Sequence, residues 1–380
     1  MRIGFDGKRA IRNFTGLGNY SRYLIGMMYR QHPSGAYLLY APEYRQSRQL
    51  DSLLAGCPGL EFRYPQGLWK RFRSLWRTFG ITRRLDRDRV DIYHGLSNEL
   101  PLNIRKARRT KSVVTVHDLI FIRYPRYYAP IDRWLYRYKY GKSCRNADAV
   151  VAISECTKND IIRYFHTDPS KIRTIYQGCD PSFSAEASEA EKDEARKAYG
   201  LPPRYILNVG SIEERKNVML AVKAMKGLPG DVHLVIVGKP TPYTRKVEQF
   251  IAGNGLSARV HLLHNVAFSH LPAIYQMAEI FVYPSRYEGF GIPILEALSS
   301  GIPVVAATGS CLEEAGGKSS LYVGPDDEEG MKSALLRLLG DAGLRKRMAE
   351  EGRRHALNFS MERQAKQLMD LYEQLLSDKK

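Results

Sequence analysis

The run Arg286-Tyr287-Glu288-Gly289-Phe290-Gly291-Ile292-Pro293-Ile294-Leu295-Glu296 comes shortly after the apolar run Ile280–Tyr283, which is typical of a buried strand. The two glycines predict a loop, and Pro293 suits the first position of a helix. Strand, loop and helix in this order form the repeating unit of a parallel α/β sheet. The run therefore predicts an α/β fold and marks a joint between a strand and a helix.

The same run of residues also indicates what kind of ligand binds there. A helix begins with N–H groups that have no partner in the helix, and its dipole is positive there, which favours a bound phosphate. Glu288 and Glu296, eight positions apart, cannot bind phosphate but can accept hydrogen bonds from hydroxyl groups. A phosphate site flanked by two hydroxyl acceptors predicts a nucleotide sugar as the ligand. The alternative is a plain helix N-terminus with two surface acids.

Short apolar runs alternate with helical stretches over the whole chain, which favours two α/β domains in 380 residues. Strands are predicted at Arg2–Phe5, Tyr37–Tyr40, Ile92–His94, Ser112–His117, Ala149–Ile153, Ile172–Ile175, Tyr205–Gly210, Val232–Val237, Val260–Leu263, Ile280–Tyr283 and Val304–Ala306. Helices are predicted at about 19–31, 133–145 and 360–376, and from Ser154 onward. We expect a first domain over residues 1–182, a second over 198–358 and a last helix over 359–380. The segment Pro181–Lys192, short of large apolar residues, reads as the linker.

Open α/β domains bind ligands outside the carboxyl ends of their strands, so two in tandem should face each other across a cleft. After the strand ending in Gly210-Ser211, the adjacent cations Arg215 and Lys216 suit a diphosphate. A solvated surface pair is the alternative. Backbone groups around Val237–Pro240 and His264–Val266 could form the walls of a slot for the base.

In the first half, His117 closes the predicted strand Ser112–His117 and could hydrogen-bond a sugar hydroxyl or a developing charge. A structural strand-end histidine is the alternative, and His94 is a weaker candidate. The loop Thr15–Asn19 contains Gly16 and Gly18 but is not a dinucleotide fingerprint, because Ser21 stands where a third glycine would be. We interpret it as a second loop facing phosphate or acceptor, with a tight turn as the alternative.

With these residues in view, the chain resembles the retaining glycosyltransferases of family 4 (group 1) over essentially its whole length. The resemblance rests on Gly210-Ser211, Arg215-Lys216-Asn217, Tyr283-Pro284-Ser285, Glu288-Gly289-Phe290-Gly291, Glu296-Ala297, Gly301–Val305, Gly16–Tyr20, Val116-His117-Asp118 and Val151–Glu155. It implies the GT-B fold, with two Rossmann-like domains and a C-terminal helix that crosses back to the first domain.

The resemblance also implies a role for each matching residue. Arg215 and Lys216 would hold the donor diphosphate, and Gly16, Gly18, Gly210 and Ser211 would lie near it. Glu296 would bind the ribose, and Glu288 with the backbone at Phe290, Gly291 and Ile292 would hold the transferred sugar. His117 would lie close to the sugar on the acceptor side. Ser211 departs from the basic residue that many members carry there, so phosphate binding should depend more on the two cations.

The resemblance implies transfer with retention of configuration, by attack on the same face with the leaving phosphate helping to take the acceptor proton. No DxD-type acidic motif is present in the predicted donor-binding domain, residues 198–358, so we expect no metal and no other cofactor, with Arg215, Lys216 and the helix start stabilising the leaving group. Glu288 is not expected to be a covalent nucleophile. The expected reaction moves a hexose, with mannose favoured, from a nucleoside diphosphate to a saccharide or lipid-linked acceptor in surface-polysaccharide biosynthesis.

Charge distribution adds a second class of partner. Of the 58 Lys and Arg residues, 33 lie in residues 1–190 against 17 acids, whereas residues 191–380 hold 25 against 23. Basic runs with aromatics, such as Trp69–Arg73, predict an anionic membrane surface as a partner, with a solvated surface as the alternative. We expect no nucleic-acid partner, since no such module is recognised; a nucleic-acid-binding protein and another GT-B enzyme, such as an epimerase or a phosphorolytic enzyme, are the rivals.

The cysteines, the first residues and the apolar stretches of the sequence predict the cellular location. Five scattered cysteines suit reduced thiols in a cytoplasm, and residues 1–6 read as a strand rather than a signal peptide. No stretch is apolar enough to span a bilayer. We therefore expect a cytoplasmic protein that docks peripherally on the inner face of the membrane.

Overall fold

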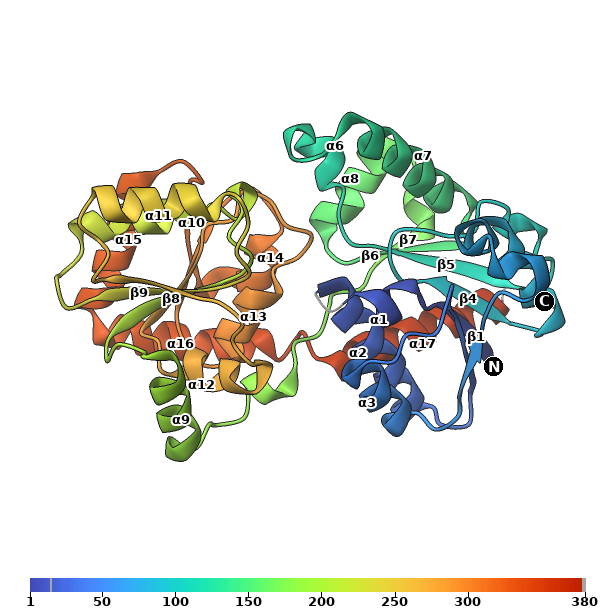
Figure 1. Ribbon diagram of the computed structural model, residues 1–380, viewed down its shortest axis with the longest axis horizontal. Coiled ribbons are helices and arrows are strands. Elements are labelled where there is room, and N and C mark those ends of the chain that lie inside the picture. Colours follow the sequence, from blue (N-terminus) through green and yellow to red (C-terminus); the bar gives the residue numbers. More distant parts are fainter. Residues whose placement is uncertain (14–15, 378–380) are drawn as a thin grey trace. The chain divides into compact units, whose positions relative to one another are not determined.

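A computed structural model describes residues 1–13 and 16–377 and divides into two units (Figure 1). Unit 1 comprises Met1–Gln177 together with the segment that starts at Met361, and unit 2 comprises Gly178–Ser360. Each unit has its own sheet, and every strand pairing in both sheets is parallel. Parallel strands need helical crossovers, which agrees with the alternating pattern of the sequence.

Unit 1 is built on seven strands in the order β3-β2-β1-β4-β5-β6-β7. The strands are β1 (Arg2–Asp6), β2 (Ala36–Tyr40), β3 (Leu60–Arg63), β4 (Ile92–Gly95), β5 (Lys111–Val116), β6 (Ala149–Ala152) and β7 (Ile172–Thr174). The α-helices are α1 (Lys8–Arg12), α2 (Gly16–Gln31), α3 (Arg48–Gly56), α4 (Arg73–Leu75), α5 (Ile81–Arg87), α6 (Ile120–Arg123), α7 (Pro130–Asn146), α8 (Glu155–Phe165) and α17 (Met361–Ser377). The direction of the strand order reverses between β1 and β4.

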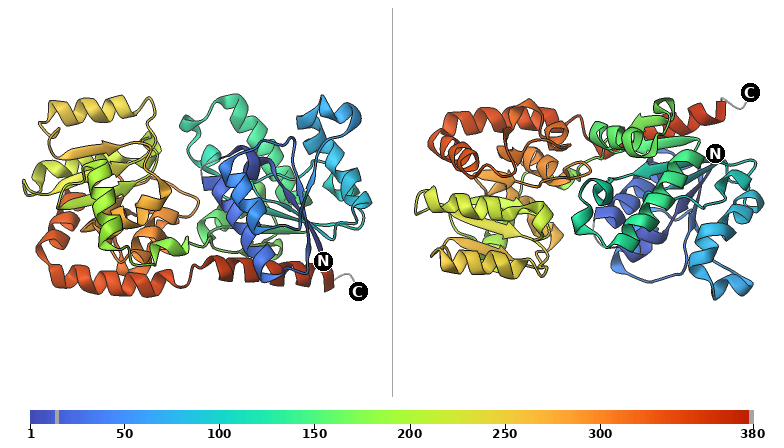
Figure 2. Two further views of the ribbon diagram at one scale, coloured as in Figure 1. Left: turned by 60° about the horizontal axis from the view of Figure 1, so that its bottom comes forward. Right: turned by 90° about the horizontal axis from the view of Figure 1, so that it is seen from above.

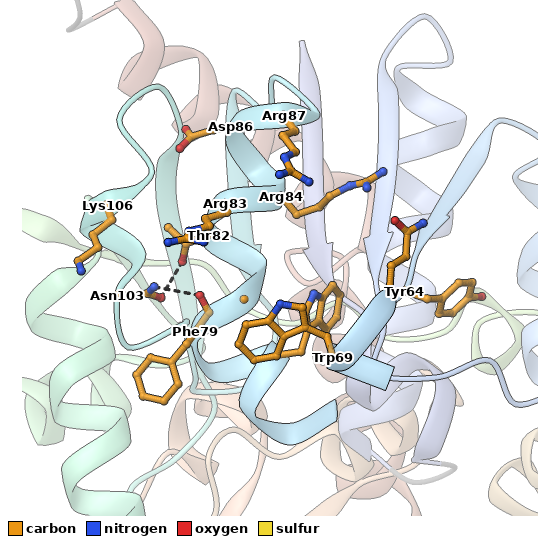
Figure 3. A pocket seen from close by; sticks show the side chains of 13 residues that line it. Tyr64, Trp69, Phe79, Thr82, Arg83, Arg84, Asp86, Arg87, Asn103 and Lys106 are labelled. Atoms are coloured by element: carbon orange, nitrogen blue, oxygen red, sulfur yellow. Dashed lines mark hydrogen bonds between the residues drawn. The ribbon is translucent and has the colours of Figure 1, made fainter. Parts of the chain in front are cut away.

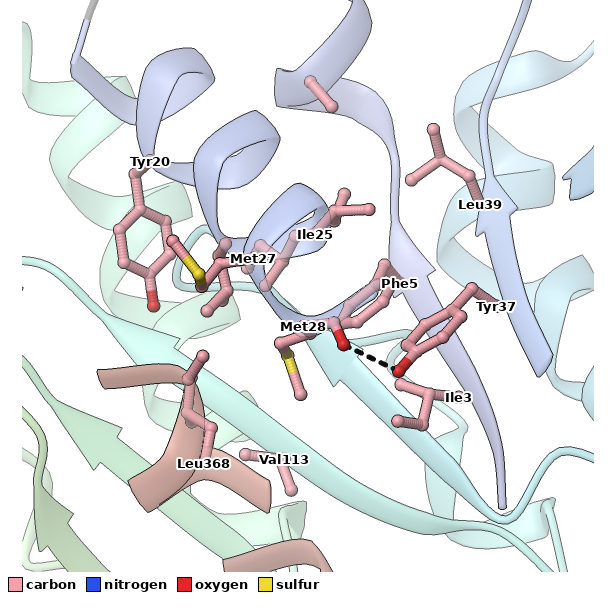
Figure 4. Close-up of a cluster of buried hydrophobic side chains, with 14 of the residues drawn as sticks. Ile3, Phe5, Tyr20, Ile25, Met27, Met28, Tyr37, Leu39, Val113 and Leu368 are labelled. Atoms are coloured by element: carbon pink, nitrogen blue, oxygen red, sulfur yellow. Dashed lines mark hydrogen bonds between the residues drawn. The ribbon is translucent and has the colours of Figure 1, made fainter. Parts of the chain in front are cut away.

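Both faces of this sheet are buried because side chains alternate along each strand. Tyr37 and Leu39 of β2 join one core with Phe5, Leu368 and residues of α2, whereas the intervening Leu38 joins the opposite core, formed with α5, α7 and α8. Figure 4 shows the first of these cores, with Leu368 of α17 beside Val113 of β5. The last helix is therefore an integral part of unit 1.

Helix α17 lies alongside α2, as Figure 1 and the left panel of Figure 2 show. Tyr372 of α17 is fully buried and its hydroxyl lies 2.6 Å from Nδ1 of His94, at the centre of the sheet. On its other side the His94 ring bonds Thr115 through Nε2, at 2.8 Å. The sequence pattern predicted a helix with one buried face, and the structure confirms that element.

Unit 2 is built on six strands in the order β10-β9-β8-β11-β12-β13. The strands are β8 (Tyr205–Val209), β9 (His233–Val237), β10 (Val260–Leu263), β11 (Ile280–Tyr283), β12 (Val304–Ala307) and β13 (Leu321–Val323). The α-helices are α9 (Glu189–Tyr199), α10 (Val218–Ala224), α11 (Thr244–Gly253), α12 (Leu271–Gln276), α13 (Ile292–Ser299), α14 (Leu312–Gly316), α15 (Glu328–Gly340) and α16 (Ala342–Ala356). Here the strand order reverses between β8 and β11.

One expectation from the sequence is wrong. Pro181–Lys192 was read as a linker unable to add to a core, but Phe183 within it is fully buried. Its ring packs edge-on against Tyr275 of α12, with ring centroids 5.3 Å apart. The segment also supplies Ser188, which begins α9 with a capping box. A single aromatic residue thus attaches this stretch to unit 2, and the units divide at Gly178 instead.

No helix in residues 1–13 or 16–377 is both long enough and apolar enough to cross a membrane. The edge strands β3 and β13 were not predicted, because each is short and only partly buried.

Candidate functional site

The chemistry-bearing residues of unit 2 lie at the carboxyl ends of β8 and β11, the two strands where the order reverses. Ligands of open α/β sheets bind in the crevice at such a point. Arg215 and Lys216 lie on the short helix η7 (Glu214–Lys216) after β8, and Glu288 lies in the loop after β11. The loops are joined through their backbones, since the N–H of Arg286 donates to the carbonyl of Arg215 at 2.9 Å.

The carboxylate of Glu288 is held by both cations. Its Oε2 lies 2.9 Å from Nη1 of Arg215, and its Oε1 lies 2.7 Å from Nζ of Lys216. Ser285 Oγ donates to the same Oε1 at 2.6 Å, and the hydroxyl of Tyr283 donates to it at 3.2 Å. The two cations were predicted to hold a diphosphate, and in this structure they converge on the carboxylate of Glu288.

These contacts fix the ionisation of the cluster. Burial disfavours a charged carboxyl group, but Lys216 and Arg215 outweigh it and lower the pKa of Glu288 to about 2. Burial likewise opposes the charge on Lys216, yet Glu288 raises the pKa of that ammonium above its ordinary value. Arg215 also pairs with Glu213, at 2.6 Å, so the two cations face two carboxylates and the cluster carries no net charge in this structure.

Helix α13 begins directly beside this cluster, at Ile292, with Pro293 in its first turn. Gly291 precedes it with φ 129°, a conformation that favours glycine. A Cβ atom at Gly291 would lie 3.1 Å from Cδ2 of Leu312, so a larger residue would also be crowded. Phe290 is buried, and its carbonyl accepts from the Cys311 thiol at 2.9 Å. The loop is held in one shape. At the start of the helix Pro293 has no N–H and the N–H of Ile294 donates to the carbonyl of Gly291 at 2.9 Å, so Ile292 carries the first helical N–H without a partner in the helix.

Glu296, one turn into α13, has a different environment. Its Oε2 accepts a hydrogen bond of 2.7 Å from the buried hydroxyl of Tyr275. Burial raises the pKa of Glu296 to about 7, while the Tyr275 hydrogen bond acts against the rise and the nearby Asp180 adds to it. Lys216 acts on the charge of Glu296 as well as on that of Glu288. Both predicted carboxylates therefore lie within the electrostatic range of one ammonium group.

Close backbone packing shapes the end of β8. The N–H of Gly210 donates to the carbonyl of Val237 at the end of β9, at 2.9 Å. A Cβ atom at Gly238 would lie 1.9 Å from the carbonyl oxygen of Gly210, so no other residue fits there without a backbone shift. Ser211 follows on this turn, and its carbonyl accepts from the N–H of Glu213. Lys216 packs against Gly210, 3.7 Å from where a Cβ would be.

Val266, the predicted base contact, lies after β10 and is half-buried. Asn265 before it has φ 59°, and His264 Nδ1 lies 2.7 Å from the carbonyl of Gly238. The loops after β8, β9 and β10 are thus linked in sequence, through Gly210, Gly238 and His264. These contacts bring the predicted base slot and the diphosphate residues to one edge of the sheet.

In unit 1, His117 follows β5 and is buried, and its ring contacts that of Tyr20 edge-on, with centroids 4.6 Å apart. Its Nε2–H donates to the carbonyl of Leu96 at 2.8 Å, and its Nδ1 lies 3.1 Å from the amide nitrogen of Gln177, which donates to it. Burial lowers the pKa of His117 to about 4, so the ring is neutral. Both ring nitrogens are engaged within unit 1, which the sequence could not show.

Gly16 and Gly18 lie in the first turn of α2, three residues earlier than the predicted helix start, while Thr15 lies outside the described residues. A Cβ atom at Gly18 would lie 1.7 Å from the carbonyl oxygen of Asn13, so this position requires glycine. Gly16 has open space around it. Of the two predicted glycines, only Gly18 is explained by packing within the unit.

Sequence reasoning gave no role to several residues that build the site. Tyr283 links Lys216 to Glu288 through its hydroxyl, Ser285 bonds Glu288, and Tyr275 bonds Glu296. Tyr283 and Ser285 belong to one of the family landmarks, which was their only signal. Tyr275 lies in the middle of an apolar helix, so nothing in the sequence marked it. In the part of the chain that the structure describes, no three His, Cys, Asp or Glu side chains gather to hold a metal ion.

Comparison with known proteins agrees with this geometry. Residues 16–183 match the family described as Glycosyltransferase Family 4, and residues 191–355 match Glycosyl transferases group 1. The chain is 31% identical over 290 residues to O-antigen chain mannosyltransferase B of Escherichia coli, covering 75% of this chain and 74% of that protein. It is also 31% identical over 222 residues to O-antigen chain mannosyltransferase RfbU of Salmonella typhimurium, covering 58% and 59%.

Among solved structures, HepE of Anabaena in complex with UDP and glucose is similar with a TM-score of 0.78 at 18% identity, covering 98% of this chain and 100% of that one. A sucrose-phosphate synthase from Thermosynechococcus elongatus has a TM-score of 0.79 at 20% identity, covering 100% of each chain. These likenesses confirm the predicted fold class, two Rossmann-like α/β domains of the GT-B type. With both halves matched and the mannosyltransferase of Escherichia coli related over three quarters of its length, the chain belongs to glycosyltransferase family 4, group 1.

Proposed function

We propose that this glycosyltransferase moves a hexose, with mannose favoured, from a nucleoside diphosphate to a saccharide or lipid-linked acceptor in surface-glycan biosynthesis. The observation that carries the donor class is the cluster of Arg215, Lys216 and Glu288 beside the first turn of α13. The mannosyltransferase names of its relatives from Escherichia coli and Salmonella typhimurium support the sugar and the glycan setting.

We assign the diphosphate to the two cations and to the first N–H group of α13. As the bond between sugar and phosphate breaks, negative charge grows on the leaving diphosphate, and the cations stabilise it. Glu288, ionised and held by four donors, positions these cations and accepts from sugar hydroxyls. Its engagement with Lys216, Arg215, Ser285 and Tyr283 argues against a covalent role.

The remaining assignments follow from this one. Glu296 binds the ribose hydroxyls, Gly210 and Ser211 lie near the diphosphate, and the loop at Val266 takes the base side of the nucleotide. In unit 1, we assign Gly16 and Gly18 to the donor phosphates and His117 to the sugar on the acceptor side. We propose retention of configuration by same-face attack without a metal ion, and a working place at the cytoplasmic face of an anionic membrane.

The first experiment is a thermal-shift series with GDP, UDP, ADP and their sugar conjugates, with and without EDTA. One nucleotide that raises the melting temperature in EDTA identifies the base and supports a metal-free diphosphate site. A shift that vanishes in EDTA contradicts metal independence, and no shift from any nucleotide contradicts the donor assignment. Product analysis of the anomeric configuration separates retention from inversion, and it separates transfer from epimerisation.

A matched pair of lysine variants tests the charge argument. Lys216→Ala should lower turnover by about 10²–10³, the scale seen when one charge-stabilising donor is lost. Lys223→Ala, which removes a partly exposed lysine paired with Glu328 in the same unit, should leave turnover unchanged. Equal turnover in both variants would remove Lys216 from the mechanism.

A further inference from the structure

Unit 1 exposes a concentrated group of large apolar side chains between β3 and β4. Five of the fourteen exposed large apolar side chains in the described chain lie within twelve residues. They are Leu68, Trp69, Phe72, Leu75 and Phe79, with Leu68 87% exposed and Phe72 51% exposed. Isolated exposed apolar residues are ordinary, but a group of this kind marks an interaction surface.

The same segment is strongly basic. Residues 67–87 contain seven Lys and Arg residues and one acid, Asp86. Among the described residues, Lys70, Arg71, Arg83 and Arg87 have no carboxylate partner within 4 Å, and all four are exposed. We call Gly67–Arg87 the aromatic–basic surface. Because these four cations have no carboxylate partner, the surface presents positive charge, unlike a surface covered by ion pairs.

Buried polar contacts hold this surface in place. Arg77 points inward and pairs with Asp6 at 2.8 Å and with Glu99 at 2.5 Å, both at the carboxyl edge of the sheet. The amide nitrogen of Asn103 donates to the carbonyl of Phe79 at 2.9 Å. Trp76, within the same segment, is buried. The exposed side chains therefore stand on an anchored backbone rather than on a frayed loop.

A cavity of about 590 Å³ lies within the surface. Figure 3 shows the rings of Trp69 and Phe79 on one side of it and the guanidinium groups of Arg84 and Arg87 on another. One side is thus apolar and another is cationic. A phospholipid has the matching character, because its anionic phosphate lies close to the start of its apolar acyl chains.

We propose that the aromatic–basic surface docks the protein on an anionic phospholipid bilayer. Leu68, Trp69 and Phe72 enter the interfacial region, where aromatic rings are favoured, while Arg83 and Arg87 contact lipid phosphates. Each cation near an anionic surface adds to the attraction, and the apolar side chains add area removed from water. Duplex nucleic acid is a poorer match, because its bases are stacked inside the helix and it offers Leu68 and Leu75 no extended apolar surface.

This inference extends the membrane location proposed above and does not depend on the identity of the donor. The chain provides its own probes, since its three tryptophans are the exposed Trp69, the buried Trp76 and the exposed Trp134 of α7. One full-length variant, Trp76→Phe with Trp134→Phe, keeps only Trp69. A second, Trp69→Phe with Trp76→Phe, keeps only Trp134 and serves as the matched control.

Both variants are mixed with vesicles of phosphatidylcholine, with and without phosphatidylglycerol, and with lipids brominated on their acyl chains. We expect the emission of Trp69 to shift to shorter wavelength and to be quenched by brominated lipid only in anionic vesicles. Trp134 should respond to neither. A response from Trp134 and none from Trp69, no response from either, or equal binding to neutral vesicles would overturn the proposal.

A second set of variants separates docking from the donor site. Leu68→Ser with Phe72→Ser should weaken binding to anionic vesicles at least about tenfold, and Arg83→Glu with Arg87→Glu should do the same at low salt. Both should keep the thermal shift given by the nucleotide, which shows that unit 2 is intact. Ile131→Ser, at an exposed position of α7, is the control. Unchanged vesicle binding, or tighter binding of an oligonucleotide than of vesicles by this surface, would refute it.

Discussion

At the residue scale, the carboxyl groups of Glu288 and Glu296 belong to one short run of sequence but have opposite ionisation tendencies. Glu288 lies between two cations, which lower its pKa to about 2. Glu296 lies under α12 with one hydroxyl partner, and burial raises its pKa to about 7. The first charge is stabilised in the free protein, whereas the second is costly. We interpret that cost as the consequence of keeping an acceptor ready for ribose hydroxyls.

This difference predicts how stability depends on pH. Glu296 binds its proton more tightly in the folded state than in the unfolded state, so its ionisation destabilises the fold as pH rises from about 4.5 to about 7. Glu296→Gln removes the ionisable group and, with it, this destabilisation of the fold. The variant should gain nothing relative to wild type near pH 4.5 and on the order of 1–3 kcal/mol at pH 8. Melting temperatures of both proteins across this range provide the measurement.

The same variant should bind the nucleotide more weakly than wild type at pH 8, because a neutral amide is a poorer acceptor for ribose hydroxyls. Stability and affinity would thus change in opposite directions. Glu288→Gln is the comparison, since its carboxylate is stabilised by Lys216 and Arg215, so the change should destabilise the free protein. A Glu296→Gln variant that is less stable at pH 8, or that binds nucleotide as tightly as wild type, would contradict this account.

At the element scale, the ends of β8 and β9 approach so closely that the loops depend on one another. Gly238→Ala would place a methyl group 1.9 Å from the Gly210 carbonyl, forcing the turn that carries Ser211 to move. We expect loss of nucleotide binding by at least about tenfold, since a shift of about 1 Å is enough to disturb such sites. Gly230→Ala, where no atom lies within 4 Å, is the control and should bind normally. Calorimetric titration with the nucleotide measures both.

Helix α17 gives the second prediction at this scale. Leu368 is fully buried in the core shared by α2 and β5 (Figure 4). Leu368→Ala should therefore cost about 2–5 kcal/mol of unfolding free energy. Leu357→Ala, the same change at a side chain 76% exposed, should cost less than about 0.5 kcal/mol. Denaturant unfolding of the two variants compares them directly, and equal losses would mean that α17 is not part of the core.

How much the sequence could predict also depends on the element. Fully buried strands such as β5 and β11 were predicted nearly to their limits, because continuous apolar runs allow few other readings. The edge strand β3 was missed, since only Leu60 of its residues is buried. The predicted linker was wrong because burial of Phe183 depends on Tyr275, about ninety positions away. Composition over a dozen residues cannot detect such a partner.

The site shows the same limit. Arg215, Lys216 and Glu288 were predicted from their types and their place after strands, and the structure joins them by contacts of 2.9 Å or less. That Glu288 binds both cations could not be predicted, because it depends on the reversal of strand order between β8 and β11. For His117, position after a strand suggested an available ring, whereas Leu96 and Gln177 engage both ring nitrogens. Hydrogen-bond partners of that kind are fixed only by tertiary structure.

At the scale of the whole molecule, the two units differ in continuity. Unit 2 is one segment, Gly178–Ser360, and holds Arg215, Lys216, Glu288 and Glu296. Unit 1 needs two segments, because α17 lies after unit 2 in the chain and still supplies core residues such as Leu368 and Tyr372. We therefore expect unit 1 to fold only with the last helix present, whereas the core of unit 2 is formed by residues within its own limits.

This asymmetry predicts the behaviour of fragments. Residues 178–360 alone should unfold cooperatively and show a thermal shift with the same nucleotide as the full chain, since Arg215, Lys216, Glu288 and Glu296 all lie in it. Residues 1–177 alone should lack a cooperative transition, because the core beside α2 and the buried His94 are left uncovered. A synthetic peptide of residues 361–377 should restore the transition, and the same peptide with Leu368→Ala should restore it less well.

A cooperative fragment 1–177 without the peptide would show that α17 only covers a unit that is already folded. A fragment 178–360 that folds but ignores the nucleotide would show that unit 2 alone is not enough for donor binding.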